Sequence, residues 1–150
     1  MSAIGLPGVE RPRDEDRAVE QLRRIQEAID SLGYYLKRAM DSIRLTGQTA
    51  TITGSVLLTK PAAGRYLVLG SIRTTTTSAA GAAAFSLGFT DDAGAETPTP
   101  IAAHSLMAAG QSNFSQFVTV ASGDLTYSVT LSGVVGSPQF AIDISVFKVP

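Results

Sequence analysis

The sequence predicts a mainly β protein, in which an N-terminal α-helical coiled coil precedes an antiparallel β-sandwich of the jelly-roll type, and the whole chain is expected to form a homotrimer. Apolar residues recur every three or four positions up to about residue 45 and alternate with polar residues from about residue 49 onward. Charge changes at the same place: residues 1–48 carry 8 basic and 8 acidic side chains, and residues 49–150 carry only 4 and 5. We therefore expect an arm at 1–13, a coiled-coil helix at 14–46 and a β-sandwich head at 47–150.

The expected arm contains two glycines and two prolines, which discourage regular structure. One interpretation is a frayed chain end. The other is an anchoring peptide that inserts three apolar side chains into a partner surface: Ile4, Leu6 and Val9. The sequence leaves both interpretations open.

The expected helix is marked at both ends by charge. Its first turn is acidic, from Asp14 to Asp16, and its last turns are basic, with Arg44 near the end, as the helix dipole favours. Gly47 follows and can end a helix in the left-handed conformation.

The apolar residues of this helix follow a heptad, the 3.5-residue repeat of a left-handed coiled coil. The predicted oligomer interface consists of Leu22, Ile25, Ile29, Leu32, Leu36, Ala39 and Ile43, with Ala18 one step earlier. The flanking e and g positions hold no charged residue, and Ile and Leu do not follow the dimer pattern, which favours three strands over two. The alternative is that this stripe packs on the chain's own β domain, as most amphipathic helices do.

The remaining chain shows the period of two that is typical of strands. In 125–132 the large residues Leu125, Tyr127 and Val129 alternate with Ser and Thr, and 139–147 repeats the pattern. Further strands are expected at 50–59, 65–76, 85–89, 101–107 and 113–121, separated by turn sequences. The outward residues are Ser, Thr, Ala and Gly, where an isolated sandwich normally carries charge. This surface suits contact with further copies of the chain, or it is simply neutral.

No pattern of catalytic or metal-binding residues stands out, so we expect neither an enzyme nor a cofactor. His104 is the only histidine, it has no carboxylate nearby in sequence, and we expect it at the surface or in a loop. The acidic cluster at Asp91, Asp92 and Glu96 fits a hairpin turn better than a calcium loop. Asp143 lies in the middle of a strand, and it could pair with Arg73 or Lys148 across a subunit contact, or face water.

Composition also limits the partners. The formal net charge is −1, so nothing predicts binding to nucleic acid. The chain has no cysteine, which excludes disulfides and thiolate metal sites. No stretch approaches the roughly 20 apolar residues of a spanning helix, so membrane insertion is not expected.

An arm, a coiled coil at 14–45 and a head rich in Ser, Thr, Gly and Ala that ends in SVFKVP together resemble small trimeric bacteriophage virion proteins: head fibres, decoration spikes and tail-fibre tips. More distantly, the pattern is similar to the trimeric jelly rolls of the tumour-necrosis-factor and C1q type. The resemblance to virion proteins implies assembly in the host cytoplasm, location in the virion, and attachment of the N-terminal arm to capsid, portal or tail proteins. It also implies an outward head, which could decorate the particle or bind a host-surface glycan. The alternative function is a carbohydrate- or receptor-binding module of a host-attachment apparatus.

Overall fold

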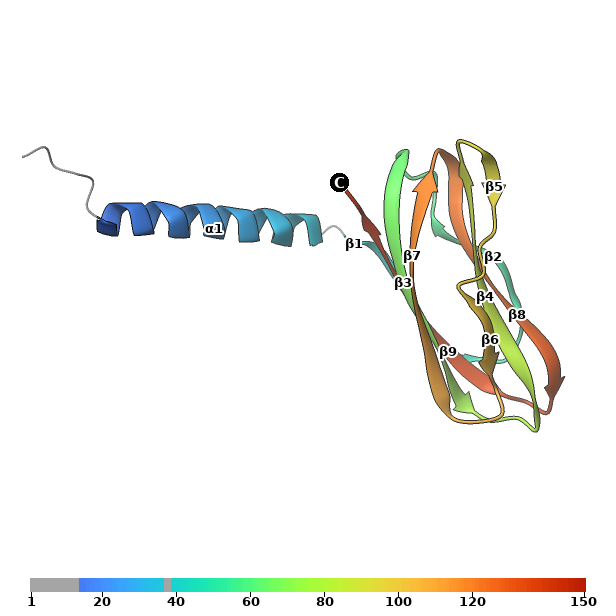
Figure 1. The fold of residues 1–150 in the computed structure, drawn as a ribbon. Coiled ribbons are helices and arrows are strands. Elements are labelled where there is room, and N and C mark those ends of the chain that lie inside the picture. The colour runs from blue at the N-terminus through green and yellow to red at the C-terminus, as the bar shows by residue number, and fades with distance from the viewer. Residues whose placement is uncertain (1–13, 37–38) are drawn as a thin grey trace, which may run out of the picture. The chain divides into compact units, whose positions relative to one another are not determined.

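The structure of the protein, a computed structural model, describes residues 14–36 and 39–150 (Figure 1). The chain divides into two compact units, one that contains the helix α1 (Asp14–Leu36) and one, Arg38–Pro150, that contains all the strands. At 1.5 Å per residue, the 23 residues of α1 extend about 35 Å. Within the described residues, no helix combines the length and apolar character needed to cross a membrane.

The second unit is built from nine antiparallel strands in two sheets. The four-stranded sheet has the order β1-β9-β3-β7, and the other has the order β2-β8-β4-β5, with β6 also paired to β4. The bounds are β1 (Ala39–Gln48), β2 (Ile52–Leu58), β3 (Gly64–Thr76), β4 (Ala80–Asp91), β5 (Gly94–Glu96), β6 (Ile101–Ser105), β7 (Gly110–Val120), β8 (Ser122–Val135) and β9 (Gln139–Lys148).

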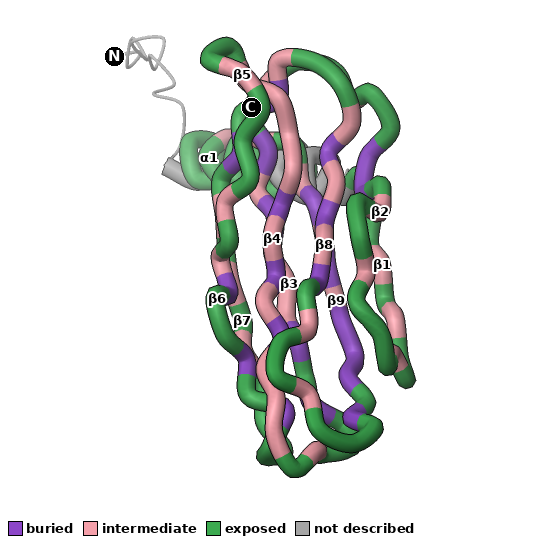
Figure 2. Tube along the Cα trace, turned by 90° about the vertical axis from the view of Figure 1, so that its right-hand side faces the viewer, coloured by how far each residue is buried: buried purple, intermediate pink, exposed green. Residues whose placement is uncertain are grey.

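Leaving aside the short β5 and β6, successive strands alternate between the two sheets, the wrapping expected of a jelly roll. The predicted antiparallel β-sandwich is therefore present. Buried positions alternate with more exposed ones along the strands, as Figure 2 shows in purple, pink and green. On β8, for example, Leu125, Tyr127 and Val129 are buried, and the Thr and Ser residues between them are not, as the alternation predicted.

The core between the sheets is centred on aromatic rings. Phe85 on β4 is fully buried, and its ring lies 4.7 Å from Phe114 and 6.1 Å from Tyr127, measured between centroids. Gly70 on β3 stands opposite Phe114 in the register, and a Cβ atom at this position would clash with the Phe114 ring. The missing side chain at Gly70 therefore makes room for an aromatic ring that contributes to the core.

The structure corrects the predicted end of the helix. We expected a coiled coil over 14–46, but α1 ends at Leu36 and the chain re-enters regular structure as β1 at Ala39. Ala39 and Ile43 therefore do not belong to a helical interface. Ile43 is half-buried against the core of the sandwich and pairs with Ile144 of β9. The head correspondingly begins near residue 38 rather than at residue 47.

The physical reason is that residues 39–48 satisfy both periods. Ile43 continues the heptad, but Ile43 and Leu45 are also two positions apart and separated by Arg44, so they can line one face of a strand. Pairing with β9 buries both residues against the core, and this tertiary contact outweighs helix propensity. Arg44 then stands opposite Asp143 and donates a 2.7 Å hydrogen bond from Nε to Oδ1. Within one chain Asp143 thus pairs with Arg44, a partner that the sequence did not indicate, and a pairing with Arg73 or Lys148 across a subunit contact stays a prediction.

Candidate assembly interface

One face of α1 carries large apolar side chains exposed to solvent. Val19, Leu22, Ile25 and Ile29 are 64%, 66%, 56% and 53% exposed, respectively. Three of these, Leu22, Ile25 and Ile29, are residues of the predicted interface and share the a and d positions of the heptad. We call Leu22, Ile25 and Ile29 the apolar stripe. Burying such side chains is favourable, so this stripe is a surface that can drive association.

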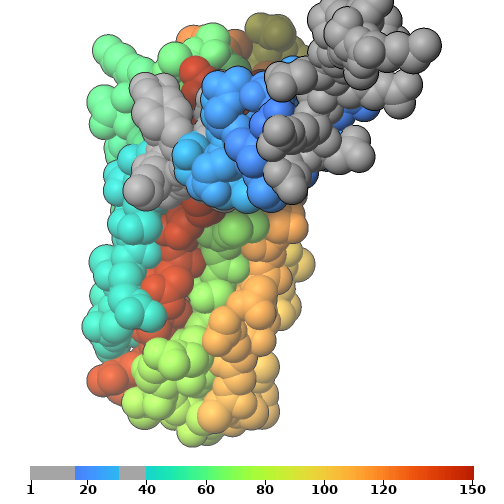
Figure 3. Space-filling view, turned by 90° about the vertical axis from the view of Figure 1, so that its left-hand side faces the viewer, coloured from blue at the N-terminus to red at the C-terminus, as the bar shows by residue number. Residues whose placement is uncertain are grey.

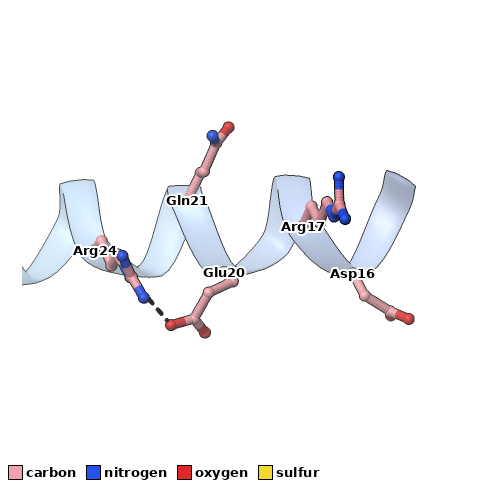
Figure 4. A pocket seen from close by; sticks show the side chains of 5 residues that line it. All are labelled: Asp16, Arg17, Glu20, Gln21 and Arg24. Carbon is pink, nitrogen blue, oxygen red and sulfur yellow. Dashed lines mark hydrogen bonds and ion pairs between the residues drawn. The ribbon is translucent and has the colours of Figure 1, made fainter. Parts of the chain in front are cut away.

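The opposite face of α1 is occupied by ion pairs. Arg23 contacts Glu20 at 2.9 Å and Glu27 at 3.3 Å, and Arg24 contacts Glu20 at 3.3 Å, as Figure 4 shows for the last pair. The two guanidinium groups lower the pKa of Glu20 below its ordinary value, with Arg23 the larger cause. These residues occupy heptad positions b, c and f, so charge lies away from the apolar stripe.

The other predicted interface and anchoring residues are placed as follows. Leu32 and Leu36 belong to α1, as predicted, but their side chains lie outside the described residues, as does that of Ala39. The proposed anchoring residues Ile4, Leu6 and Val9 also lie outside the described residues.

The head presents the outer face of its four-stranded sheet as a broad surface. Figure 3 views this face, where β1 (cyan), β9 (red), β3 (green) and β7 (orange) lie side by side. One cross-strand series on it is polar: Arg44, Asp143, Ser71 and Asn113 stand in register across the four strands. The outer face of the other sheet includes pairs of small polar residues, such as Ser86 opposite Ser128.

A second series on the outer face of the four-stranded sheet is apolar, and sequence reasoning missed it. Phe147 of β9 pairs with Leu67 of β3, and Leu67 pairs with Phe117 of β7. We call these three residues the apolar row. A signal was present in Tyr66-Leu67-Val68-Leu69, where apolar residues run continuously instead of alternating, a pattern typical of strands covered on both faces. Leu69 lies two residues along β3 from Leu67 and is 38% exposed.

His104 is buried on β6, with 4% of its surface exposed, so its predicted place at the surface was wrong. Thr74 Oγ1 donates a hydrogen bond to the carbonyl oxygen of Ser105 (3.0 Å), so its contact with His104 Nε2 (2.9 Å) requires Nε2–H as donor. His104 Nδ1 can then accept from Ser112 Oγ at 2.9 Å. These partners hold the imidazole neutral between the sheets, and burial lowers the pKa of His104 below its ordinary value of 6.5.

This burial predicts that the head is less stable in mild acid. The unfolded chain binds a proton on His104 below pH 6.5, whereas the folded chain resists it, so stability is fully present above that pH and falls below it. We expect the free energy of unfolding, measured with urea at pH 7.5, 6.5 and 5.5, to decline by at most about 1.4 kcal/mol per pH unit, the limit for one proton. His104→Gln should flatten this dependence. An unmodified head equally stable at all three pH values would contradict the prediction.

The acidic sequence at 91–96 forms the predicted hairpin turn. Asp91 Oδ1 accepts hydrogen bonds from the backbone N–H groups of Ala93 (2.7 Å) and Gly94 (3.0 Å), and Asp91 pairs with Gly94 across β4 and β5. Among the described residues, no group of three His, Asp or Glu side chains is placed to hold a metal ion. Asp91 therefore stabilises a turn through its own backbone contacts.

Comparisons with known proteins give likenesses in structure alone. No family model matches the sequence, and no curated protein matches it. The chain is similar to a chain in the structure of infectious bursal disease virus strain Gx, with a TM-score of 0.44 and 11% identity over 73% of this chain and 37% of that one. For the T13 viral particle of the same virus the TM-score is 0.43, with 10% identity over 73% of this chain and 35% of that one. For strain Gt the TM-score is 0.44, with 14% identity over 71% of this chain and 30% of that one. This chain spans about a third of the length of the chains that it matches.

Proposed function

We propose that this protein is a homotrimeric structural component of a bacteriophage virion, a fibre or decoration spike. In this proposal three copies of α1 form the stalk, the three sandwiches form the head, and residues 1–13 anchor the trimer to a capsid, portal or tail protein. Its mechanism is multivalent attachment, because three sites joined on one stalk act together. The location in a virion and the phage assignment rest on the sequence pattern of arm, heptad and head.

The observation that carries the proposal is the exposed apolar stripe on a helix whose opposite face is already satisfied by ion pairs. Leu22, Ile25 and Ile29 repeat with the 3.5-residue period that keeps apolar residues facing a second helix of the same kind. In proteins most of the stability of a helix comes from packing of its apolar face against a partner, and the apolar stripe of α1 is exposed in the single chain. Neutral flanking residues, including Gln21 and Gln26, widen the stripe and favour three helices over two.

The magnitudes indicate how strong a stalk this helix can form. Five large aliphatic residues of the heptad lie within α1, and burying each contributes about 1.5–3 kcal/mol, or about 8–15 kcal/mol per chain as an upper value. Association costs about 4–15 kcal/mol in lost translational and rotational freedom. The two terms nearly cancel, so α1 supports a weak assembly by itself, and a secure trimer needs contacts from the head as well.

A structural role also agrees with the environment of the only histidine. The ring nitrogens of His104 are hydrogen-bonded to the hydroxyl groups of Thr74 and Ser112. These hydroxyl groups hold the ring in position but, unlike a carboxylate, do not raise its basicity. The group best suited to acid–base chemistry at neutral pH is therefore used to connect β3, β6 and β7 inside the head. We propose on this ground that the protein is not an enzyme.

Removing residues 1–13 is expected to release the protein from the virion and to leave its oligomeric state unchanged. A finer variant replaces Ile4, Leu6 and Val9 by serine, which removes the apolar contacts of the proposed anchor and keeps its length. Particles assembled with each variant would be purified and their content of this protein measured by immunoblot and by electron microscopy with labelled antibody. Arg11→Gln with Arg13→Gln is the matched control in the same arm. Particles that retain the triple serine variant at the normal copy number would show that the anchor lies elsewhere.

A further inference from the structure

We propose that the apolar row of Phe147, Leu67 and Phe117 is a second self-association surface, through which the heads of sister chains contact one another. This inference rests on the proposed function, because it presumes that α1 brings the copies together. The inference extends the proposed function, because it places the contact between heads on a specific face of the sandwich. The partner is therefore a second and a third copy of this chain.

The row is apolar surface that the fold itself does not use. Phe117 is 50% exposed, and Leu67 and Phe147 are half-buried although neither packs against the core of the sandwich. The three residues stand side by side in the register of the sheet. Large apolar residues in contact on an outer face are unusual in a soluble chain unless another surface covers them.

The charges around the row do not oppose contact between identical surfaces. The guanidinium of Arg65 lies over the Phe117 ring, 4.4 Å from its centroid. The neighbouring series carries no charge and consists of Ser42, Ser145, Leu69 and Ser115. In the series beyond that, Arg44 neutralises Asp143. Like charges would repel across an interface of identical chains, and this face carries few that are unpaired.

The place of the row in the sequence favours sister chains as its occupants. Phe147 pairs with Ala39, the first residue of β1, so the row crosses the sheet at the level where the head begins. Only residues 37 and 38 separate Ala39 from Leu36, the last residue of α1. Two linking residues span at most about 11 Å between the flanking Cα atoms. Three helices joined along one axis would thus hold three copies of this level of the head close to that axis.

The weakness of the stalk points to the same occupant. The helix ends at Leu36, and Ile43 is taken into the head, so α1 has lost part of its expected interface. A contact between heads through the apolar row would supply what the shortened helix lacks. A monomer would leave the apolar stripe and Phe117 of the apolar row exposed to water.

Single-cysteine crosslinking tests this surface cleanly, because the natural chain has no cysteine. Three full-length variants would be treated with a short bismaleimide at micromolar concentration: Phe117→Cys in the row, Leu22→Cys in the apolar stripe, and Thr130→Cys as control. Thr130 is exposed on the outer face of β8, in the opposite sheet. We expect covalent dimers from Phe117→Cys and Leu22→Cys, and at least tenfold less product from Thr130→Cys. Circular dichroism would confirm that each variant folds.

The outcomes separate the inference from the proposed function. Crosslinking of Leu22→Cys without Phe117→Cys would leave the stalk in place and overturn the apolar row as a head contact. Crosslinking of neither, in a chain that sediments as a monomer, would overturn both. A second variant, Phe117→Glu, should raise the concentration at which the trimer dissociates at least tenfold, with Thr130→Glu unchanged. Equal dissociation of these two glutamate variants would also contradict the inference.

Discussion

Replacing Ile25 and Ile29 together by aspartate is expected to leave the chain monomeric and its helix largely unfolded. Both side chains are more than half exposed in the single chain, so their replacement should not change the stability of the head. In the proposed trimer the same change removes about 3–6 kcal/mol of apolar burial per chain and places six carboxylates in one interface. Every 1.4 kcal/mol is tenfold in an equilibrium constant, so the dissociation constant should rise more than a hundredfold.

Size-exclusion chromatography with light scattering would report the mass, and circular dichroism at 222 nm would report the helix. The signal should fall with the oligomer, because most of the stability of a helix comes from packing of its apolar face. The matched control is Glu27→Gln with Asp30→Asn, which changes two charges on the opposite face of the same turns. A double aspartate variant with the mass and helicity of the unmodified protein would show that the stripe is not the interface.

Phe85→Ala is expected to destabilise the head by about 3–5 kcal/mol, the usual cost of removing a buried phenylalanine. Phe85 is fully buried, and its ring packs on those of Phe114 and Tyr127, so the deletion opens a cavity between the two sheets. Phe114 in turn fills the space above Gly70, so few atoms can move in to close the cavity. The free energy of unfolding would be measured by urea titration at pH 7.5, where His104 is neutral.

Val56→Ala is the control for this experiment, because Val56 lies on an edge strand and is 45% exposed. Its loss should cost well under half as much as that of Phe85. Equal effects of the two substitutions would contradict the assignment of the aromatic cluster as the centre of the core.

The fold could be predicted from the sequence wherever the apolar residues fit either the helical period or the strand period of two, but not both. Leu125 to Leu131 alternates over a full strand, and the start of the helix is fixed by acidic residues followed by a heptad. Residues 39–48 fit both periods, and only the presence of β9 decides between them. A partner 99 residues away, as Asp143 is from Arg44, leaves no local signal. For the same reason the burial of His104 between Thr74 and Ser112 could not be foreseen.

The candidate interface divides in the same way. The apolar stripe was predictable because helical spacing places Leu22, Ile25 and Ile29 on one face regardless of what surrounds them. The apolar row was not, since Phe147, Leu67 and Phe117 come from three strands and meet only through the register of the sheet. Each of the three strands also contains apolar residues that face the core, so one further apolar residue in a strand is not a distinct signal in the sequence. Sequence spacing therefore identifies a site on one element and misses a site assembled across several.

The central claim is that identical chains cover the apolar stripe of α1, and sedimentation equilibrium of the unmodified full chain measures this most directly. Across a dilution series at micromolar concentration, we expect a mass of three times the 15.6 kDa of one chain. The mass should decline toward that of one chain only on strong dilution. A mass of 15.6 kDa at every concentration would contradict the proposed stalk, and with it the fibre or spike.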